Sequence, residues 1–295
     1  MEKHKNIEEF VRKCDETFSD SLCAIADKIS LNNELKIVSL AGPTCSGKTT
    51  AANMLLKRFA QNGMKGHIIS IDDFFYDREY LIKMSLAKGL KTPDYESIDT
   101  IDFEALKLFI DEILESNEVH CPHFDFQTGV RSEYRTISID KNDIFIFEGI
   151  QAIYPDISKI LQKHGAASIY IAPLSALTEN GHVFYPNEIR LMRRLVRDYN
   201  FRNTMPYITF DMWGGVRANE EKNIFPYVDK CTYRIDSTMP YELGILVPHL
   251  RRILAEVPKK TDHFPMAVNI LERTKDIKGI SSEILSEGSI YREFV

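Results

Sequence analysis

GPTCSGKT, at positions 42–49, matches the pattern G-x-x-x-x-G-K-[ST] at every fixed position. An apolar run at 37–41 precedes it and a helical pattern at 48–59 follows it, so the stretch links a predicted strand to a predicted helix. Glycines let the backbone turn its N–H groups inward around phosphate oxygens, and the positive end of the following helix points to the same place. The stretch therefore predicts a loop that binds the phosphates of a nucleotide.

Each position of this loop, and the residue after it, is expected to contact the nucleotide. Lys48 supplies a point charge for the β- and γ-phosphates, and the Thr49 hydroxyl is a Mg²⁺ ligand. Cys45 stands at a free position of the pattern, where a small filler suits better than a redox thiol. The expected nucleotide-binding residues are Gly42, Pro43, Thr44, Cys45, Ser46, Gly47, Lys48, Thr49 and Thr50.

Further strand candidates follow at 67–71, 143–147, 167–171 and, more weakly, 231–235. Helical patterns separate them, and Asp102 is expected to cap one of these helices. Alternating strands and helices predict an α/β protein with a mostly parallel sheet covered by helices on both faces. Together with the phosphate loop this is the P-loop NTPase fold, in which ligands gather at the carboxyl ends of the strands.

Composition narrows the class of partner. The chain of 295 residues has a net charge of −6, which argues against nucleic acid because a phosphate backbone recruits basic surfaces. We see no secretory signal in the sequence and no apolar run near the roughly 18 residues that a membrane span needs. The five cysteines form no C-x-x-C pair, so we expect reduced thiols in a cytoplasmic protein without a membrane partner.

Two carboxylates follow predicted strands at the edge where the loop lies. Asp72 comes after the strand at 67–71, and Glu148 comes after the strand at 143–147. Because parallel strands bring their carboxyl ends to one rim, both side chains are expected near the terminal phosphate. There Asp72 can accept the proton of an acceptor hydroxyl, and both acids can hold Mg²⁺. For Asp73 we expect a helix cap or a bond to backbone N–H groups instead.

Four arginines form a row with helical spacing. Arg190, Arg193, Arg194 and Arg197 fall at i, i+3, i+4 and i+7, which is one face of a helix. Like charges on one face repel, so an anion should compensate them, and guanidinium groups bind phosphates bidentately. A solvated helix with acidic neighbours is the alternative. Beside a phosphate loop, the row favours a lid that closes on the nucleotide.

The chain resembles the uridine-kinase-like nucleoside kinases of the phosphoribulokinase/uridine kinase family. Several motifs occur in the family's order over roughly residues 30–295, which is far more specific than the phosphate loop alone. SEGSIYREF at 286–294 is similar to the ending of a bacterial subgroup. The other matching segments are GPTCSGKTT at 42–50, SIDDFFYDRE at 70–79, DYESIDTIDFEAL at 94–106, PHFDFQTGVR at 122–131, IFEGIQAI at 146–153, IRLMRRLVRD at 189–198, VRANEEKNIFP at 216–226 and MPYELGIL at 239–246.

The resemblance implies a role for each matched position. Asp72 is the catalytic base near Mg²⁺, and Thr49 and Glu148 are associated with the metal. At the acceptor, Glu96 contacts the ribose hydroxyls beside the aromatic Tyr95. The other implied contacts are Arg190 at the ribose side, Arg193, Arg194 and Arg197 at the phosphates, and Phe124, Phe126 and Arg131 in the acceptor loop.

The resemblance also implies ATP, Mg²⁺ and a nucleoside that accepts phosphate on its 5′-hydroxyl. Phe124 and Gly129 stand where the family has a tyrosine and a histidine near the pyrimidine edge, so groups that select uridine or cytidine are missing. Asn203 stands where the family often has glycine after Arg202. A purine nucleoside or another sugar-like alcohol therefore stays open. So do a pantothenate- or ribulose-phosphate-like kinase and a nucleotide-binding regulator that transfers no phosphate.

We expect three parts along the chain. An N-terminal helix at 1–33 presents an apolar stripe that docks on the core, and a contact in a homo-oligomer is its less favoured use. A P-loop kinase domain follows at 34–258, with substrate loops at about 91–135 and the lid at about 183–225. A C-terminal helical tail occupies 259–295.

Overall fold

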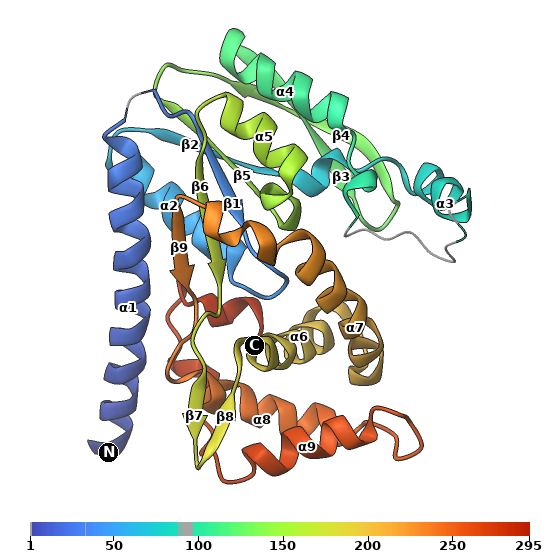
Figure 1. Cartoon of the computed structure of the whole chain (residues 1–295). Coiled ribbons are helices and arrows are strands. Elements are labelled where there is room, and N and C mark those ends of the chain that lie inside the picture. Colours follow the sequence, from blue (N-terminus) through green and yellow to red (C-terminus); the bar gives the residue numbers. More distant parts are fainter. Residues whose placement is uncertain (1, 33, 88, 90–96) are drawn as a thin grey trace.

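The strands predicted from the sequence lie side by side in one parallel sheet (Figure 1). The structure is a computed structural model that describes residues 2–32, 34–87, 89 and 97–295. Within these residues the sheet has five strands in the order β2-β5-β1-β6-β9, each parallel to its neighbours. The strands lie within two residues of the predicted positions and are β1 (Ile37–Ala41), β2 (Lys65–Ser70), β5 (Asp143–Gly149), β6 (Ala167–Ala172) and β9 (Tyr233–Asp236).

Helices cover both faces of the sheet because side chains alternate along each strand between two apolar clusters. In β1, Val38 and Leu40 belong to one cluster, whereas Ile37 and Ala41 belong to the other. Asp102 caps the start of α4 by accepting a hydrogen bond from the backbone N–H of Ala105 at 3.1 Å, as predicted. The helices are α1 (Glu2–Ser30) and α2 (Lys48–Gln61) on the first face, and α4 (Phe103–Glu115) and α5 (Pro155–Lys163) on the second.

The N-terminal helix α1 packs along α2, as its apolar stripe predicted (Figure 1). Its buried side chains in the core are Val11, Phe18, Leu22, Ile25, Ala26 and Ile29. At the rim, Arg58 of α2 donates two hydrogen bonds to the carboxylate of Asp27, at 2.6 and 2.7 Å. In the described part of the chain, no helix combines the length and the apolar character needed to cross a membrane.

The segment expected to form a lid is packed as part of the core in this structure. All residues from 189 to 196 in α6 are buried, and α6 packs against α7 and α8. Asn203 ends α6 at φ 50°, in the left-handed conformation that glycine usually adopts at this position. The elements of this region are β7 (Leu177–Glu179), β8 (His182–Phe184), α6 (Pro186–Arg202), α7 (Pro206–Asn223), α8 (Glu242–Leu254) and α9 (Phe264–Thr274).

Within the predicted substrate loops, residues 122–135 belong to a hairpin made of β3 (Glu118–Asp125) and β4 (Val130–Ser138). Its turn rests on the start of α3 (Arg78–Ala87), where the Arg78 backbone N–H donates to the carbonyl of Gly129 at 2.7 Å. Gly129 has φ +75°, and a Cβ there would lie 2.7 Å from the Cβ of Arg78. The turn therefore requires glycine at this position.

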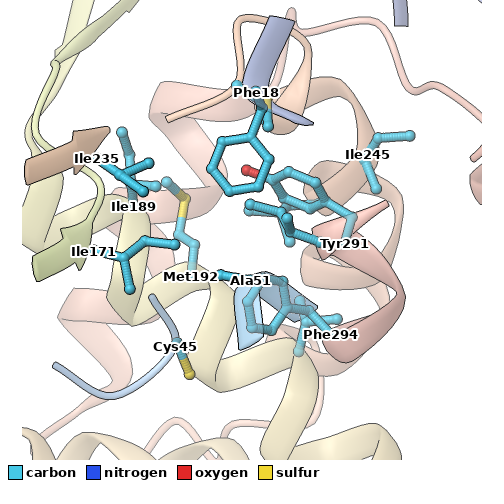
Figure 2. Close-up of a cluster of buried hydrophobic side chains, with 14 of the residues drawn as sticks. Phe18, Cys45, Ala51, Ile171, Ile189, Met192, Ile235, Ile245, Tyr291 and Phe294 are labelled. Atoms are coloured by element: carbon cyan, nitrogen blue, oxygen red, sulfur yellow. The ribbon is translucent and has the colours of Figure 1, made fainter. Parts of the chain in front are cut away.

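The C-terminal residues are built into the core rather than appended to it. Ile290, Tyr291 and Phe294 are fully buried, in the same cluster as the first turns of α2. Figure 2 shows Tyr291 and Phe294 next to Ala51, with Phe18 of α1 above them. The predicted helical tail thus contains α9, followed by short 3-10 turns that end at the base of the phosphate loop.

Candidate active site

The stretch 42–47 forms a tight loop between β1 and α2. A Cβ on Gly42 would lie 2.2 Å from the carbonyl oxygen of Ile171, so only glycine lets the loop pass β6 this closely. The Lys48 ammonium reaches back across the loop and donates to the carbonyls of Gly42 at 2.9 Å and Pro43 at 3.2 Å. Burial lowers the pKa of Lys48, and the charges of nearby carboxylates oppose this shift. The ammonium of Lys48 therefore lies against the phosphate loop itself.

A pocket of 670 Å³ opens at the carboxyl ends of β1, β2 and β5. It is lined by residues 44–49 of the loop, by Asp72 and by Glu148, so the structure brings together the groups that the sequence placed past strand ends. Register explains the meeting, because Glu148 lies opposite Leu40 of β1 and Ser70 of β2. The Ser70 hydroxyl donates to the Glu148 carboxylate at 3.1 Å.

Asp72 lies in a 3-10 turn (Ile71–Phe74) that directly follows β2. Burial raises the pKa of Asp72 to about 6, and the charge of Glu148 adds to the increase. A hydrogen bond donated by the Gln151 amide at 3.2 Å and the charge of Lys48 act in the opposite direction. A carboxylate with a pKa near neutrality takes up a proton more readily than an ordinary aspartate, which is what a general base needs.

The oxygen groups of the pocket fit Mg²⁺ and phosphate. Asp72, Glu148 and the hydroxyl of Thr49 line the pocket, and Mg²⁺ prefers such hard oxygen ligands. The hydroxyl of Ser46 and the amide oxygen of Gln151 are buried there and have no hydrogen-bond partner among the residues that the structure describes. Among the described residues no group of three or more His, Cys, Asp or Glu side chains could hold a metal by itself. Such a sparse set suits Mg²⁺, which takes its remaining ligands from water and substrate phosphates.

Two of the four arginines on α6 are bound inside the protein, which corrects their predicted contacts. Both terminal nitrogens of Arg190 donate to Glu220 of α7 at 2.6 Å. Arg193 is fully buried and pairs with Glu242 of α8 at 2.9 Å. Neither arginine lines the pocket, so the structure does not place them against ribose or phosphate. Carboxylates of α7 and α8 supply the anions that the spacing of the row demanded.

The other two arginines do face the pocket. Arg194 and Arg197 line it together with the loop, and both pair with Asp198, at 3.1 and 2.7 Å. The guanidinium of Arg197 also lies 3.4 Å from the hydroxyl of Thr44. These two arginines are therefore the members of the row that line the pocket, whereas Arg193 reaches the loop carbonyl of Cys45 without lining it.

The acceptor side is only partly described. Phe126 lines the pocket, whereas Phe124 is buried. The ring centroids of these two phenylalanines lie 5.2 Å apart. Asp73 accepts a hydrogen bond from the backbone N–H of Phe124 at 3.0 Å, which confirms its expected role. Arg131 pairs with Asp102 at 2.8 Å and does not line the pocket. Tyr95 and Glu96 lie outside the described residues.

Some pocket residues had no role assigned from the sequence. Gln151 lies in the segment IFEGIQAI, and its contact with Asp72 follows from the 3-10 turn (Ile150–Ile153) after β5. Phe75, within the matching segment at 70–79, and Arg202, four residues after the one at 189–198, also line the pocket. Glu293 lines it from the far end of the chain, and no local pattern indicates that contact.

Because burial disfavours the charged form of Asp72, we expect that removing the charge of its carboxylate stabilises the folded protein. A folded-state pKa of about 6 against an ordinary 3.8 means that protonation favours the folded form, so this contribution is lost as the pH rises through 6. Because the pocket opens to solvent, we expect this contribution to the free energy of unfolding to be about 1–2 kcal/mol. Without nucleotide and with EDTA, Asp72→Asn should unfold at a higher temperature than wild type at about pH 7.5, and the difference should shrink near pH 4.5. A difference that is the same at both values would contradict the assigned environment.

Known proteins resemble this chain in sequence and in fold. The model of the Phosphoribulokinase / Uridine kinase family matches residues 37–231. The chain is 29% identical over 167 residues to the uridine kinase of Ureaplasma urealyticum serovar 10, covering 57% of this chain and 70% of that protein. It is 27% identical over 198 residues to the uridine kinase of Staphylococcus epidermidis, covering 66% and 84%.

The solved structure of D-glycerate 3-kinase from Cryptococcus neoformans shares the fold. It superposes with a TM-score of 0.51 at 15% identity, over 78% of this chain and 97% of that one. The family match begins with β1, ends at residue 231 and includes the phosphate loop, both carboxylates and the arginines of α6. The chain belongs to the Phosphoribulokinase / Uridine kinase family and is a phosphotransferase that acts on an alcohol.

Proposed function

We propose that the protein transfers the γ-phosphate of ATP to the 5′-hydroxyl of a nucleoside. The observation that carries this proposal is the position of Asp72, a carboxylate with a raised pKa in the same pocket as the phosphate loop. A carboxylate at this position can accept the proton of a hydroxyl that attacks the terminal phosphate, which suits transfer to an alcohol. The uridine kinases among the relatives support a nucleoside as that alcohol.

In the transfer, separate groups of residues bind the phosphates, neutralise the developing charge and accept the proton. The backbone N–H groups of the loop and the ammonium of Lys48 bind the phosphates, and Arg194 and Arg197 neutralise the charge that develops on the transferred group. Asp72 takes the proton of the acceptor hydroxyl as its oxygen bonds to phosphorus and ADP leaves. Mg²⁺ bound through Thr49, Asp72 and Glu148 would polarise the phosphate oxygens.

The acceptor pocket favours a nucleoside without strict selection of its base. Phe124 is buried and Gly129 has no side chain, so neither offers a hydrogen bond to a base edge. Sites that lack such polar contacts discriminate weakly between related substrates. We therefore propose that purine and pyrimidine nucleosides are both accepted, with Phe126 against the acceptor and the undescribed Tyr95 and Glu96 at the ribose, as the family resemblance implies.

An acceptor panel tests this function. We expect Mg-ATP to phosphorylate uridine, cytidine, adenosine or guanosine, with the product identified by mass, and to leave 5′-deoxyuridine unmodified because it lacks the reacting oxygen. Lys48→Ala serves as the control for contaminating kinases and should lose the product. Turnover of pantothenate, ribulose 5-phosphate or D-glycerate without any nucleoside would replace the proposed acceptor. Nucleotide binding with no product from any alcohol would favour a regulator.

A further inference from the structure

Glu293, two residues before the last residue of the sequence, reaches the phosphate loop. It ends a 3-10 turn (Ile290–Glu293). Its carboxylate accepts hydrogen bonds from both the backbone N–H of Thr50 at 2.6 Å and the hydroxyl of Thr50 at 2.5 Å. The same carboxylate lines the pocket that contains Lys48, Asp72 and Glu148. The contact therefore joins the end of the chain to the predicted nucleotide site.

The N–H group that Glu293 occupies is one that the loop would offer to an anion. The first N–H groups of an α-helix have no acceptor within the helix, and the positive end of the helix dipole attracts negative charge to them. In α2 the N–H of Ala51 already donates to the carbonyl of Gly47 at 3.0 Å. Thr50 is the next N–H group toward the loop, and a carboxylate satisfies it in the way that a phosphate oxygen would.

The segment around Glu293 is anchored, so the carboxylate can leave only by rotating its own side chain. Tyr291 and Phe294 on either side are fully buried (Figure 2). The hydroxyl of Tyr291 accepts a hydrogen bond from the guanidinium of Arg193 at 2.7 Å, and the same guanidinium donates to the loop carbonyl of Cys45 at 3.3 Å. Glu293 itself is partly exposed and can turn toward solvent.

Charge decides whether Glu293 and a nucleotide can share the loop. The ammonium of Lys48 already interacts with the charges of Glu148, Glu293 and Asp72. In the proposed function the charges of Asp72 and Glu148 are balanced by Mg²⁺, whereas Glu293 holds a main-chain N–H group that phosphate would use. Two anions at one N–H group repel each other, and a triphosphate tail brings several negative charges.

We propose that Glu293 is a built-in competitor of the nucleotide, an autoinhibitory carboxylate that must leave Thr50 before a phosphate group binds there. The proposal rests on the nucleotide site of the proposed function, and it raises the nucleotide concentration that is needed to fill that site. Molecules in which Glu293 occupies Thr50 cannot bind phosphate fully, so the apparent affinity is reduced by the fraction of free loops. The C-terminal turn thereby sets how much nucleotide is needed to fill the site.

Equilibrium binding of ADP, with Mg²⁺ and without any acceptor, tests the competitor. Glu293→Gln keeps the shape and the hydrogen-bond acceptor but removes the charge, and we expect it to bind ADP about tenfold more tightly than wild type by calorimetry. Glu287→Gln is the matched control, because Glu287 is exposed in the same segment and loses the same charge. It should bind ADP as wild type does. Glu293→Ala, checked for folding by its melting temperature, should tighten binding at least as much.

The outcomes separate this proposal from the nucleotide site on which it rests. Weaker or unchanged ADP binding by Glu293→Gln, while wild type binds ADP, would overturn the competitor and make Glu293 a support of the loop. Equal tightening by Glu287→Gln would overturn it too, since the effect would then be one of net charge. No binding of ADP or ATP by wild type would instead remove the nucleotide site, and the competitor with it.

Discussion

Asp72→Asn is expected to lower phosphoryl transfer by about 10²-fold or more, the usual scale for losing a positioned general base. The asparagine side chain keeps the size of aspartate and can still face Gln151, but it cannot accept the proton of the acceptor hydroxyl. Nucleotide binding should stay nearly intact because the loop and Lys48 are unchanged. Since the variant is also expected to be more stable than wild type near neutral pH, lost activity cannot be ascribed to unfolding.

The neighbouring residue provides the control for this experiment. Asp73→Asn changes the same charge one position along the chain, but its side-chain oxygen can still accept the N–H of Phe124 that Asp73 holds at 3.0 Å. We expect its turnover number to stay within several-fold of wild type. Turnover numbers with a saturating acceptor, together with calorimetric ADP affinities, make the comparison. Near-normal turnover by Asp72→Asn would remove Asp72 from the role of base.

Features encoded by neighbouring residues could be predicted from the sequence. The positions of the strands, the cap at Asp102 and the meeting of the loop with Asp72 and Glu148 follow from short apolar runs and from the rule that parallel strands share a carboxyl edge. Such signals need no knowledge of which distant segments touch. They were therefore sufficient for the fold and for the centre of the candidate site.

Contacts between distant segments could not be predicted in this way. The spacing of the arginines on α6 correctly indicated that anions must face them, but not that Glu220 and Glu242 would supply two of these anions. Glu293 lies in a segment that resembles a family ending, yet nothing local indicates that it reaches Thr50 across the whole chain. Tertiary packing decided these partners.

Arg193→Met is expected to destabilise the protein by about 3–5 kcal/mol, because it leaves a buried carboxylate without its partner. Arg193 and Glu242 are both fully buried, with two hydrogen bonds between them at 2.9 and 3.2 Å. The same guanidinium donates to the carbonyl of Ser237 at 2.7 Å and lies over the rings of Tyr291 and Phe294, at 5.1 and 5.5 Å. Methionine fills much of the volume but satisfies none of these groups.

The matched control is Arg197→Met, the same change on the same helix. Arg197 pairs with Asp198, which Arg194 also binds, so no buried carboxylate is left alone and the loss should be about 1 kcal/mol or less. Chemical denaturation of both variants measures the difference. The double variant Arg193→Met with Glu242→Leu should lose less stability than the two single changes added together, because the uncompensated charge is gone.

Nucleotide affinity then separates support of the fold from support of the loop. Arg193 also donates to the carbonyl of Cys45 at 3.3 Å. The double variant lacks this hydrogen bond, because methionine at position 193 has no side-chain donor. The double variant should therefore regain stability but still bind ADP several-fold more weakly than wild type, because the loop is no longer held from behind. Wild-type affinity in a stable double variant would limit Arg193 to a structural role. A loss below about 1 kcal/mol in Arg193→Met would contradict the buried pair itself.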